Sequence, residues 1–423
     1  MVHILEEFKN FLDTSPTSWH AAYQIGNRLA MQDFIPLNEN EKWQIEPGQK
    51  YFIIRGGSVC AFSLPSSTPQ RGVILASHTD SPSLKIKPRP EIRIENMLAL
   101  GVEVYGHPLL TSWLNRDLGI AGRIVVTDAS GNIEEKLVVI DDSPLIIPQL
   151  AIHFDREVNE KGLTLNKQEH LCPLLGLDEN QHSIEDLLKR HVSFHSLLSS
   201  DLFLFPLERS RFLGLENELI ASYRIDNLAS AHACLTALAC AHRPQKNTIQ
   251  MAVFWDHEEV GSKSLEGAES PFFSEILKRI FHGLKLDKED LFIFKRQSLC
   301  LSVDMAHAVH PNHLKALDPN HGPKLGKGPV IKYNAAQRYA SNAFSAAQVI
   351  RLCQKLNLNV QSFVNRSDIP SGSTVGPLFA HHDGIATVDI GCPQLSMHSI
   401  REVMACQDYF DICRLLTHVL QEE

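Results

Sequence analysis

No stretch of the 423-residue chain approaches the roughly 20 consecutive apolar residues that a membrane-spanning helix needs. The amino terminus also lacks the apolar core of a signal peptide, since Glu6, Glu7, Lys9 and Asn10 interrupt it. These absences predict a cytoplasmic protein with no membrane partner.

The chain also has fewer basic residues than acidic ones. The chain has 40 Lys and Arg against 49 Asp and Glu, a formal net charge of −9 at pH 7, and no basic block stands out. The sequence pI is near 6.2. Because binding to nucleic-acid phosphates requires clustered positive charge, we expect no nucleic-acid partner and favour a small molecule or a peptide.

Cysteine is present, but not in a pattern that would crosslink the chain or bind zinc. The nine cysteines form no Cys-x-x-Cys pair, and an odd number argues against a complete disulfide framework. We therefore expect reduced thiols. Internal repeats and low-complexity tracts are absent too, so nothing indicates a repeat architecture.

What is present is the alternation of strands and helices that is typical of α/β proteins. Apolar runs predict strands at residues 72–76, 249–255 and 299–303, and helical periodicity predicts helices at residues 228–241 and 271–284. A chain of this length is expected to form more than one domain.

The middle of the chain has a different pattern. Residues 122–127 and 133–140 predict a β-hairpin around an Asp-Ala-Ser-Gly-Asn turn. We predict an α/β domain with a doubly wound mixed sheet over residues 1–90 and 213–423. An inserted β-rich domain over residues 91–212 interrupts it.

The pattern at residues 253–262 predicts a buried apolar strand, followed by Asp256, His257, Glu258 and Glu259 and then by a glycine turn. On an extended backbone Glu258 and Glu259 would point to opposite sides, so that one could bind a metal while the other handles a proton. The alternative is a solvated charge cluster at a strand end.

Four other segments place potential ligands beside strands or helices. One segment contains both His78 and Asp80, and the other three contain Asp226, Asp304 and His398. In open α/β sheets ligands collect beyond the carboxyl ends of the strands, so these residues can converge. The alternatives are a structural His-x-Asp pair, a helix cap at Asp226 and a capping pair of His398 with its neighbouring serine.

If they converge, His78, Asp226, Glu259, Asp304 and His398 form a ligand set suited to zinc, manganese or cobalt. Five protein ligands are too many for one catalytic zinc with an open position. Two metals that share a bridging carboxylate would each have three ligands and room for a bridging hydroxide. Asp226, at the start of a helix, is the candidate bridge.

The remaining carboxylates suit two supporting roles. A second carboxylate must take a proton from the nucleophile and deliver it to the leaving amine, and Glu258 fits. Asp80, two residues after His78, can accept a hydrogen bond from the other imidazole nitrogen and fix its tautomer.

Five segments together resemble, in order and spacing, the aspartyl aminopeptidase family of two-zinc metallopeptidases. They are residues 76–82, 224–228, 256–262, 304–312 and 397–402. The match covers nearly the whole chain, and the segment at 304–312 is the most specific to that family.

The resemblance implies a metallopeptidase domain interrupted by a β-rich dimerisation domain, in a homododecamer built from dimers. It also implies two divalent metal ions, most typically zinc. The implied assignments are Asp226 as the bridge, Glu259 and His398 on one metal, His78 and Asp304 on the other, and Glu258 as general base.

The resemblance assigns two further residues. Lys332 is similar to the family lysine that meets an acidic substrate side chain, and His153 to the histidine that reaches a neighbouring subunit's active site. For Lys332 the alternative is a solvated surface lysine, and His153 is otherwise an isolated loop histidine. Ser371 departs from the family pattern, which has cysteine there.

We therefore expect a metalloaminopeptidase that removes an unblocked N-terminal Asp or Glu from peptides, through a metal-bridged hydroxide with Glu258 as general base. The alternatives are an aminopeptidase of broad specificity, a two-metal deacylase or carboxypeptidase on the same scaffold, and a metal-bearing structural shell.

Overall fold

The computed structural model describes residues 2–178, 181–242, 244 and 247–422. Its chain divides into two compact units. The first comprises Met1–Asp80, Arg211–Met397 and Glu402–Glu423, and the second comprises Ser81–Ser210 with His398–Arg401. The sequence predicts an inserted domain over residues 91–212. In the structure the second unit begins earlier, at Ser81, because β5 (Ser83–Ile94) is a single strand that continues through position 91.

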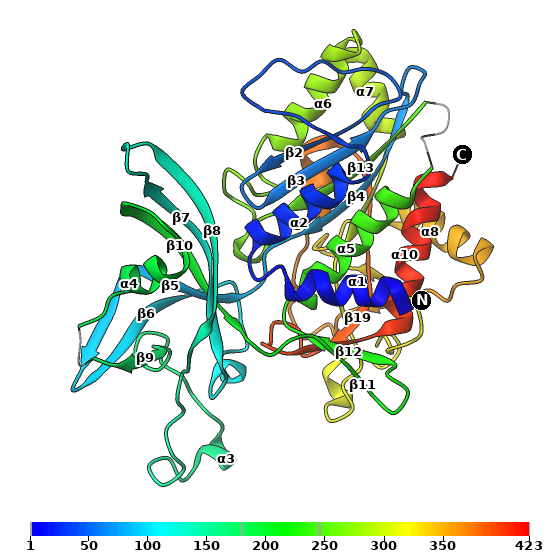
Figure 1. Cartoon of the computed structure of the whole chain (residues 1–423). Helices are drawn as coiled ribbons and strands as arrows, with labels where there is room; N and C mark the ends of the chain where they lie inside the picture. Colours follow the sequence, from blue (N-terminus) through cyan, green and yellow to red (C-terminus); the bar gives the residue numbers. More distant parts are fainter. Residues whose placement is uncertain (1, 179–180, 243, 245–246, 423) are drawn as a thin grey trace. The chain divides into compact units, whose positions relative to one another are not determined.

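A nine-stranded mixed sheet forms the centre of the first unit (Figure 1). Its strands, in order across the sheet, are β1 (Ile35–Pro36), β2 (Lys50–Arg55), β3 (Ser58–Ser63), β13 (Thr248–Trp255), β4 (Arg71–His78), β14 (Leu299–Val303), β18 (Ala386–Gly391), β16 (Val330–Tyr333) and β17 (Gln361–Val364). The central strands β13, β4, β14 and β18 are parallel, whereas β3 and β16 run antiparallel to their central neighbours. The predicted α/β class with a mixed sheet is confirmed.

Apolar side chains of the central strands alternate between two cores, because successive strand residues point to opposite faces. In β13, Ala252 and Phe254 belong to one core, while Met251, Val253 and Trp255 belong to the other. The first core is covered by α1 (Val2–Asp13), α2 (Ser18–Ala30), α5 (Ile225–Cys240), α8 (Ala343–Lys355) and α10 (Cys406–Gln421).

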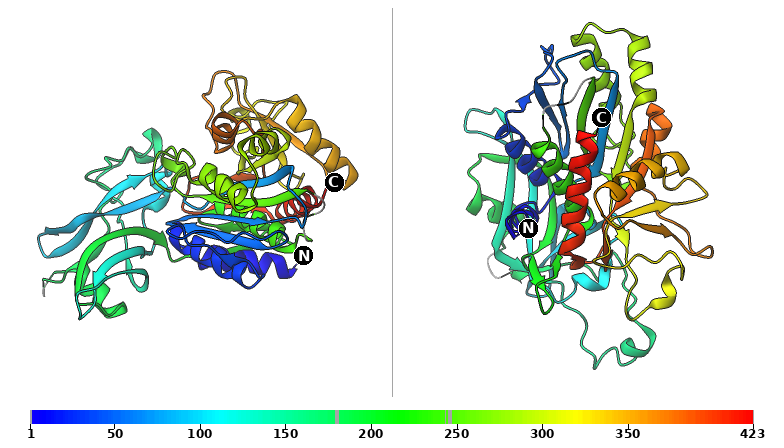
Figure 2. Two further views of the ribbon diagram at one scale, coloured as in Figure 1. Left: turned by 90° about the horizontal axis from the view of Figure 1, so that it is seen from above. Right: turned by 90° about the vertical axis from the view of Figure 1, so that its right-hand side faces the viewer.

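The second core is covered by α6 (Phe272–Gly283), α7 (Lys288–Gln297) and the π-helical η4 (Phe379–Asp383), which continues α9 (Gly376–Leu378). Helices on both faces make the sheet doubly wound (Figure 2). Among the described residues, none of the helices combines the length and the apolar character needed to cross a bilayer.

A smaller sheet completes the first unit. Its strands are, in order, β11 (Arg211–Leu213), β12 (Leu219–Ser222), β20 (Glu402–Ala405), β19 (Pro393–Leu395) and β15 (Ala306–His307). β12 leads into α5, and β15 closely follows β14, so this sheet adjoins two of the segments that carry candidate ligands. Two short 3-10 helices, η2 (Glu258–Val260) and η3 (Leu314–Ala316), lie in the loops after β13 and β15.

The second unit is built on an antiparallel sheet. Its strands are, in order, β8 (Ile133–Leu145), β7 (Leu118–Thr127), β10 (Ser196–Pro206), β5, β6 (Met97–Tyr105) and β9 (Leu174–Leu177), with η1 (Leu110–Trp113), α3 (Val158–Lys161) and α4 (Ile184–His191) in the connections. The predicted hairpin is present, with Thr127 paired to Ile133. The Asp128 carboxylate closes its turn by accepting the N–H groups of Ser130 and Asn132, both at 2.8 Å.

The sequence did not predict α7. Four apolar residues in a row interrupt its charged residues, so the pattern shows no helical period. Only Leu291 and Phe294, three residues apart on one face, are buried, while Phe292 and Ile293 between them are exposed. The available signal was the start of the helix, where Asp287 and Asp290 form a capping box.

The Asp287 side chain accepts the N–H groups of Glu289 at 2.8 Å and Asp290 at 3.0 Å. Asp287→Ala leaves these donors without an acceptor and is expected to lower the free energy of unfolding by about 1 kcal/mol. Asp287→Ser should retain most of the stability. Urea unfolding of the three proteins measures the difference, and equal stability of wild type and Asp287→Ala would contradict the capping role.

Candidate active site

Three neighbouring parallel strands end together at one edge of the nine-stranded sheet. Trp255, the last residue of β13, pairs with His78, the last residue of β4, and Ser302 of β14 pairs with Ala76 of β4. Asp304, two residues after Ser302, therefore stands level with His78. The register brings His78, Asp304 and the residues after Trp255 to the carboxyl edge of the sheet, where open α/β proteins bind ligands.

The backbone turns sharply after β13. His257 has a left-handed φ of 63°, and Glu258–Val260 form η2. The prediction that Glu258 and Glu259 lie on opposite sides of an extended backbone is therefore wrong. The reason is Asp80, which accepts the Glu258 N–H at 3.1 Å and the Glu259 N–H at 3.0 Å. Successive N–H groups of an extended strand diverge, so only a tight turn directs both to one carboxylate.

Four carboxylates gather at the imidazole of His78. Its Nε2 lies 3.5 Å from Asp226 Oδ1, 3.6 Å from Asp304 Oδ1 and 4.0 Å from Glu258 Oε2. Glu259 also offers an oxygen within 4.8 Å of ligand atoms of His78 and of Asp226. All but Glu258, which is partly buried, have less than a tenth of their surface exposed. Carboxylates confined in this way need a positive counter-charge to stay ionised.

Asp80 faces the other nitrogen of His78. Nδ1 lies 3.1 Å from the backbone oxygen of Asp80 and 3.3 Å from its Oδ1. Both neighbours are acceptors, so in the neutral ring Nδ1 carries the hydrogen and Nε2 presents its lone pair to the carboxylates. Asp80 thus orients the imidazole and also holds the turn at Glu258.

Three buried residues around Asp226 were not among the predicted site residues. Glu402 Oε2 accepts the backbone N–H of Asp226 at 2.9 Å. Asn227 Nδ2 donates to the backbone oxygen of the last residue of β14 at 2.9 Å, and the Arg224 guanidinium donates to a carbonyl just after β4. Arg224 lies two residues before Asp226 and Asn227 directly after it, so their position beside a predicted ligand could have identified them from the sequence.

Burial and neighbouring charges together shift the pKa values of His78 and Glu258. Burial by itself lowers the pKa of His78, but its contacts with Asp226, Asp304 and Asp80 raise that pKa well above its ordinary value. Burial raises the pKa of Glu258 to about 8, an effect that His78 opposes and the surrounding carboxylates reinforce. The acids around His78 therefore favour a positive charge at this point, which a divalent metal ion could supply.

The donor set fits such a metal. Carboxylate oxygens and imidazole nitrogen are hard to borderline ligands that suit zinc, manganese and cobalt. Ligand atoms around a tetrahedral zinc with bonds of about 2 Å lie roughly 3.3 Å apart, close to the separations measured around His78. The described cysteines are all free thiols, and the candidate groups contain none of them.

Lys332, on β16, lies beside this cluster. Its Nζ donates to Asp304 Oδ2 at 3.1 Å and to the backbone oxygen of Met305 at 3.0 Å, and its side chain is only 2% exposed. The alternative of a solvated surface lysine is therefore wrong. Burial by itself lowers the pKa of Lys332, but Asp304, Tyr339 and Asp389 raise it above its ordinary value, so the group is charged.

The other two predicted histidines belong to the second unit. His398 begins the segment His398–Arg401, and its Nδ1 lies 3.0 Å from the backbone oxygen of His107. His153 lies in an exposed stretch between β8 and α3. The site of the first unit thus contains the other predicted residues, namely His78, Asp80, Asp226, Glu258, Glu259, Asp304 and Lys332.

Comparison with known proteins decides the family. A family model described as "Aminopeptidase I zinc metalloprotease (M18)" matches residues 11–418. The chain belongs to the M18 family. A "Probable M18 family aminopeptidase 2" of Clostridium novyi (strain NT) is 40% identical over 422 residues, 97% of this chain and 96% of the relative. Its counterpart from Azotobacter vinelandii (strain DJ / ATCC BAA-1303) is 40% identical over 420 residues, 96% of each chain.

Solved structures agree with this assignment. A chain in "Cryo-EM structure of the Ape4 and Nbr1 complex" matches with a TM-score of 0.94 and 33% identity, over 99% of this chain and 85% of that one. A chain in "Structure of S. cerevesiae mApe1 dodecamer" matches with a TM-score of 0.85 and 26% identity, over 99% and 96%. The M18 enzyme is therefore a zinc metalloaminopeptidase, and the predicted enzyme class is confirmed.

Removing metal should destabilise this M18 enzyme, because the clustered carboxylates lose their counter-charge. A chelator is expected to abolish peptide hydrolysis and lower Tm, and added zinc should restore both. In His78→Ala, zinc bound per chain, measured by mass spectrometry after dialysis, should fall. His418→Ala, on the exposed surface of α10, is the matched control and should keep full zinc content. Wild-type zinc content in His78→Ala would contradict the site.

Proposed function

We propose that the enzyme removes an unblocked N-terminal Asp or Glu from peptides, with Glu258 as general base. The observation that carries the proposal is the carboxylate cluster at His78 with a charged, buried lysine beside it. The cluster suits metal-assisted peptide hydrolysis, and the lysine suits recognition of an acidic residue. The described cysteines are all free thiols, which suits the reducing cytoplasm expected from the sequence.

We assign the ligands to two divalent ions, zinc being the family metal. His78 and Asp304 would hold one ion, Glu259 and His398 the other, and Asp226 would bridge them. His398 follows Met397 of the first unit directly in the chain, which supports its inclusion. Zinc bound there would supply Lewis-acid polarisation of the scissile carbonyl and activation of a water molecule at neutral pH.

Glu258 is the residue placed to move protons. Its Oε2 lies 4.0 Å from His78 Nε2, at the edge of the ligand set, and its side chain is 16% exposed. A carboxylate there can take the proton of the attacking water and deliver it to the departing amine. The high pKa that burial confers on Glu258 favours holding that proton between the two steps.

Lys332 is our candidate for acidic specificity. An ammonium group has three donors, and two are directed to Asp304 and Met305, which leaves capacity for a substrate carboxylate. A buried charge of this kind favours a ligand of opposite sign. The competing role is orientation of Asp304 alone, in which case the substrate's side chain would not matter.

We assign the second unit to dimerisation within a homododecamer, with His153 reaching a neighbouring active site. A related structure is described as a dodecamer. The second unit also exposes many large apolar side chains, which suit burial between subunits. They are Ile94, Leu109, Ile133, Leu150, Ile152, Phe154, Leu177 and Leu198.

Glu258→Gln keeps the shape of the side chain but removes the base. We expect kcat to fall roughly 10²–10⁴-fold with zinc content unchanged. Steady-state kinetics together with metal analysis measure both quantities. Activity at the wild-type level in Glu258→Gln would show that another group moves the proton.

A panel of matched peptides tests the substrate. Peptides that start with Asp, Glu, Leu or Lys, each with a free or an acetylated amine, are incubated with zinc-loaded enzyme. Release from free Asp and Glu alone supports the proposal, whereas release from Leu as well indicates broad specificity. Cleavage of acetylated peptides would favour a deacylase, and absence of turnover a structural role.

The same panel separates the two roles of Lys332. Lys332→Ala should reduce kcat/KM for Asp peptides much more than for Leu peptides, because only the acidic side chain loses its partner. An equal loss on both substrates would assign Lys332 to the orientation of Asp304 instead.

A further inference from the structure

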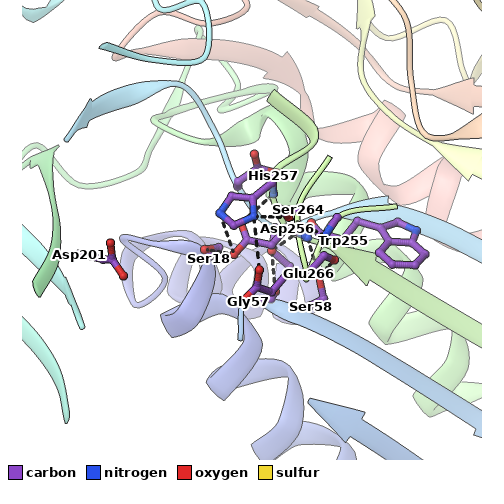
Figure 3. A network of polar contacts seen from close by, with 12 residues as sticks. Ser18, Gly57, Ser58, Asp201, Trp255, Asp256, His257, Ser264 and Glu266 are labelled. Carbon is purple, nitrogen blue, oxygen red and sulfur yellow. Dashed lines mark hydrogen bonds and ion pairs between the residues drawn. The ribbon is translucent and has the colours of Figure 1, made fainter. Parts of the chain in front are cut away.

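A network of polar contacts surrounds the residues that lead from β13 into the turn at His257 (Figure 3). At its centre is Asp256, the residue after β13, which is 1% exposed. The Asp256 N–H donates to Ser58 Oγ at 2.7 Å, and its Oδ2 accepts from Ser18 Oγ at 2.9 Å. Its Oδ1 accepts the backbone N–H of His257 at 2.9 Å. Asp256 is neither an assigned metal ligand nor the proposed base.

The partners of Asp256 come from distant parts of the first unit. Ser18 is the first residue of α2, and Ser58 begins β3 directly after Gly57. A Cβ on Gly57 would lie 2.2 Å from Asp256 Oδ2 and 2.7 Å from Ser18 Oγ. Gly57 is not among the residues with positive φ, so lack of space requires glycine here.

The network acts on Glu258 through His257. A left-handed conformation at a residue other than glycine is unfavourable, so the turn at His257 needs support. Asp256 supplies it by accepting the His257 N–H, and Ser264 Oγ lies 2.7 Å from His257 Nδ1. The turn at His257 directs the chain from β13 into η2 and so sets the direction of Glu258.

We propose that Asp256 is a positioning residue that fixes the carboxylate of Glu258 through the turn at His257. The inference rests on the proposed role of Glu258 as general base. Asp80 stabilises the turn by accepting the N–H groups of Glu258 and Glu259, and Asp256 stabilises it by accepting the N–H group of His257. Support on both sides matters, because displacement of a catalytic group by about 1 Å can cost roughly 10²-fold in rate.

Two substitutions of Asp256 distinguish its effect on the position of Glu258 from the effect of its own negative charge. Asp256→Ala removes both acceptors and should lower kcat by about 10- to 100-fold, with KM and zinc content unchanged. In Asp256→Asn, Oδ1 can still accept from His257, and the Ser18 hydroxyl can reverse its role and accept from the new amide. This conservative variant should restore most of the lost kcat. Equal losses in the two variants would overturn the proposal, because charge would then be responsible.

Gly57→Ala tests the network without altering any of its side chains. Its methyl group would displace Asp256, so kcat should fall as in Asp256→Ala. Gly72→Ala is the matched control, because its Cβ would lie 2.7 Å from Phe294 Cζ, near the opposite end of β4. Both variants should lower Tm, but only Gly57→Ala should lower kcat.

Hydrogen exchange in the zinc-loaded protein without substrate provides a readout that does not depend on turnover. Amides 257–260 should exchange faster in Asp256→Ala and Gly57→Ala, and at the wild-type rate in Asp256→Asn and Gly72→Ala. If Asp256→Ala does not fold, Ser18→Ala removes a single hydrogen bond and should show a smaller change of the same kind.

Comparison with Glu258→Gln separates the positioning role of Asp256 from the general-base role of Glu258. Wild-type kcat and exchange in Gly57→Ala and Ser18→Ala, with Glu258→Gln inactive, would overturn the positioning role and leave the general base intact. Wild-type kcat in Glu258→Gln would overturn the general base itself.

Discussion

Negative charge confined at the ends of parallel strands is the constraint on which this structure depends. Strand register brings Asp304 level with His78, and the chain after β13 adds Glu258 and Glu259. Repulsion among these carboxylates would open the edge of the sheet unless positive charge were held there. Lys332 supplies part of that charge through its contact with Asp304, and zinc, the family metal, is suited to supply the rest.

The loops that carry the site are held by contacts with one another. The carboxylate of Asp80, after β4, accepts hydrogen bonds from the turn after β13, and Glu402 of β20 accepts one from Asp226 at the start of α5. Asn227 connects that same helix start to β14. Loops at strand ends are usually the mobile parts of an α/β protein, and these hydrogen bonds restrain them in the arrangement that the site needs.

The two units differ in what they contain. The first unit supplies the described cluster of carboxylates, and its helices bury both faces of the large sheet. The second unit is built on an antiparallel sheet, and its exposed apolar residues lie both on strands, as Ile133 and Leu177 do, and in connecting segments, as Leu150 and Phe154 do. An α/β sheet covered on both faces can provide a preorganised site at the carboxyl ends of its strands.

By itself the sequence determined the α/β class, the inserted β-rich segment and the residue types at the strand ends, because apolar periodicity and polar residues after an apolar run are local properties. It did not reveal α7, whose apolar residues are consecutive, or the buried state of Lys332. Only the tertiary structure decided that the Glu258 turn folds onto Asp80, that Glu402 meets Asp226, and that Ser18 meets Asp256 across 238 positions of the chain. These contacts join segments that are far apart in sequence, and local periodicity carries no information about which segments pack together.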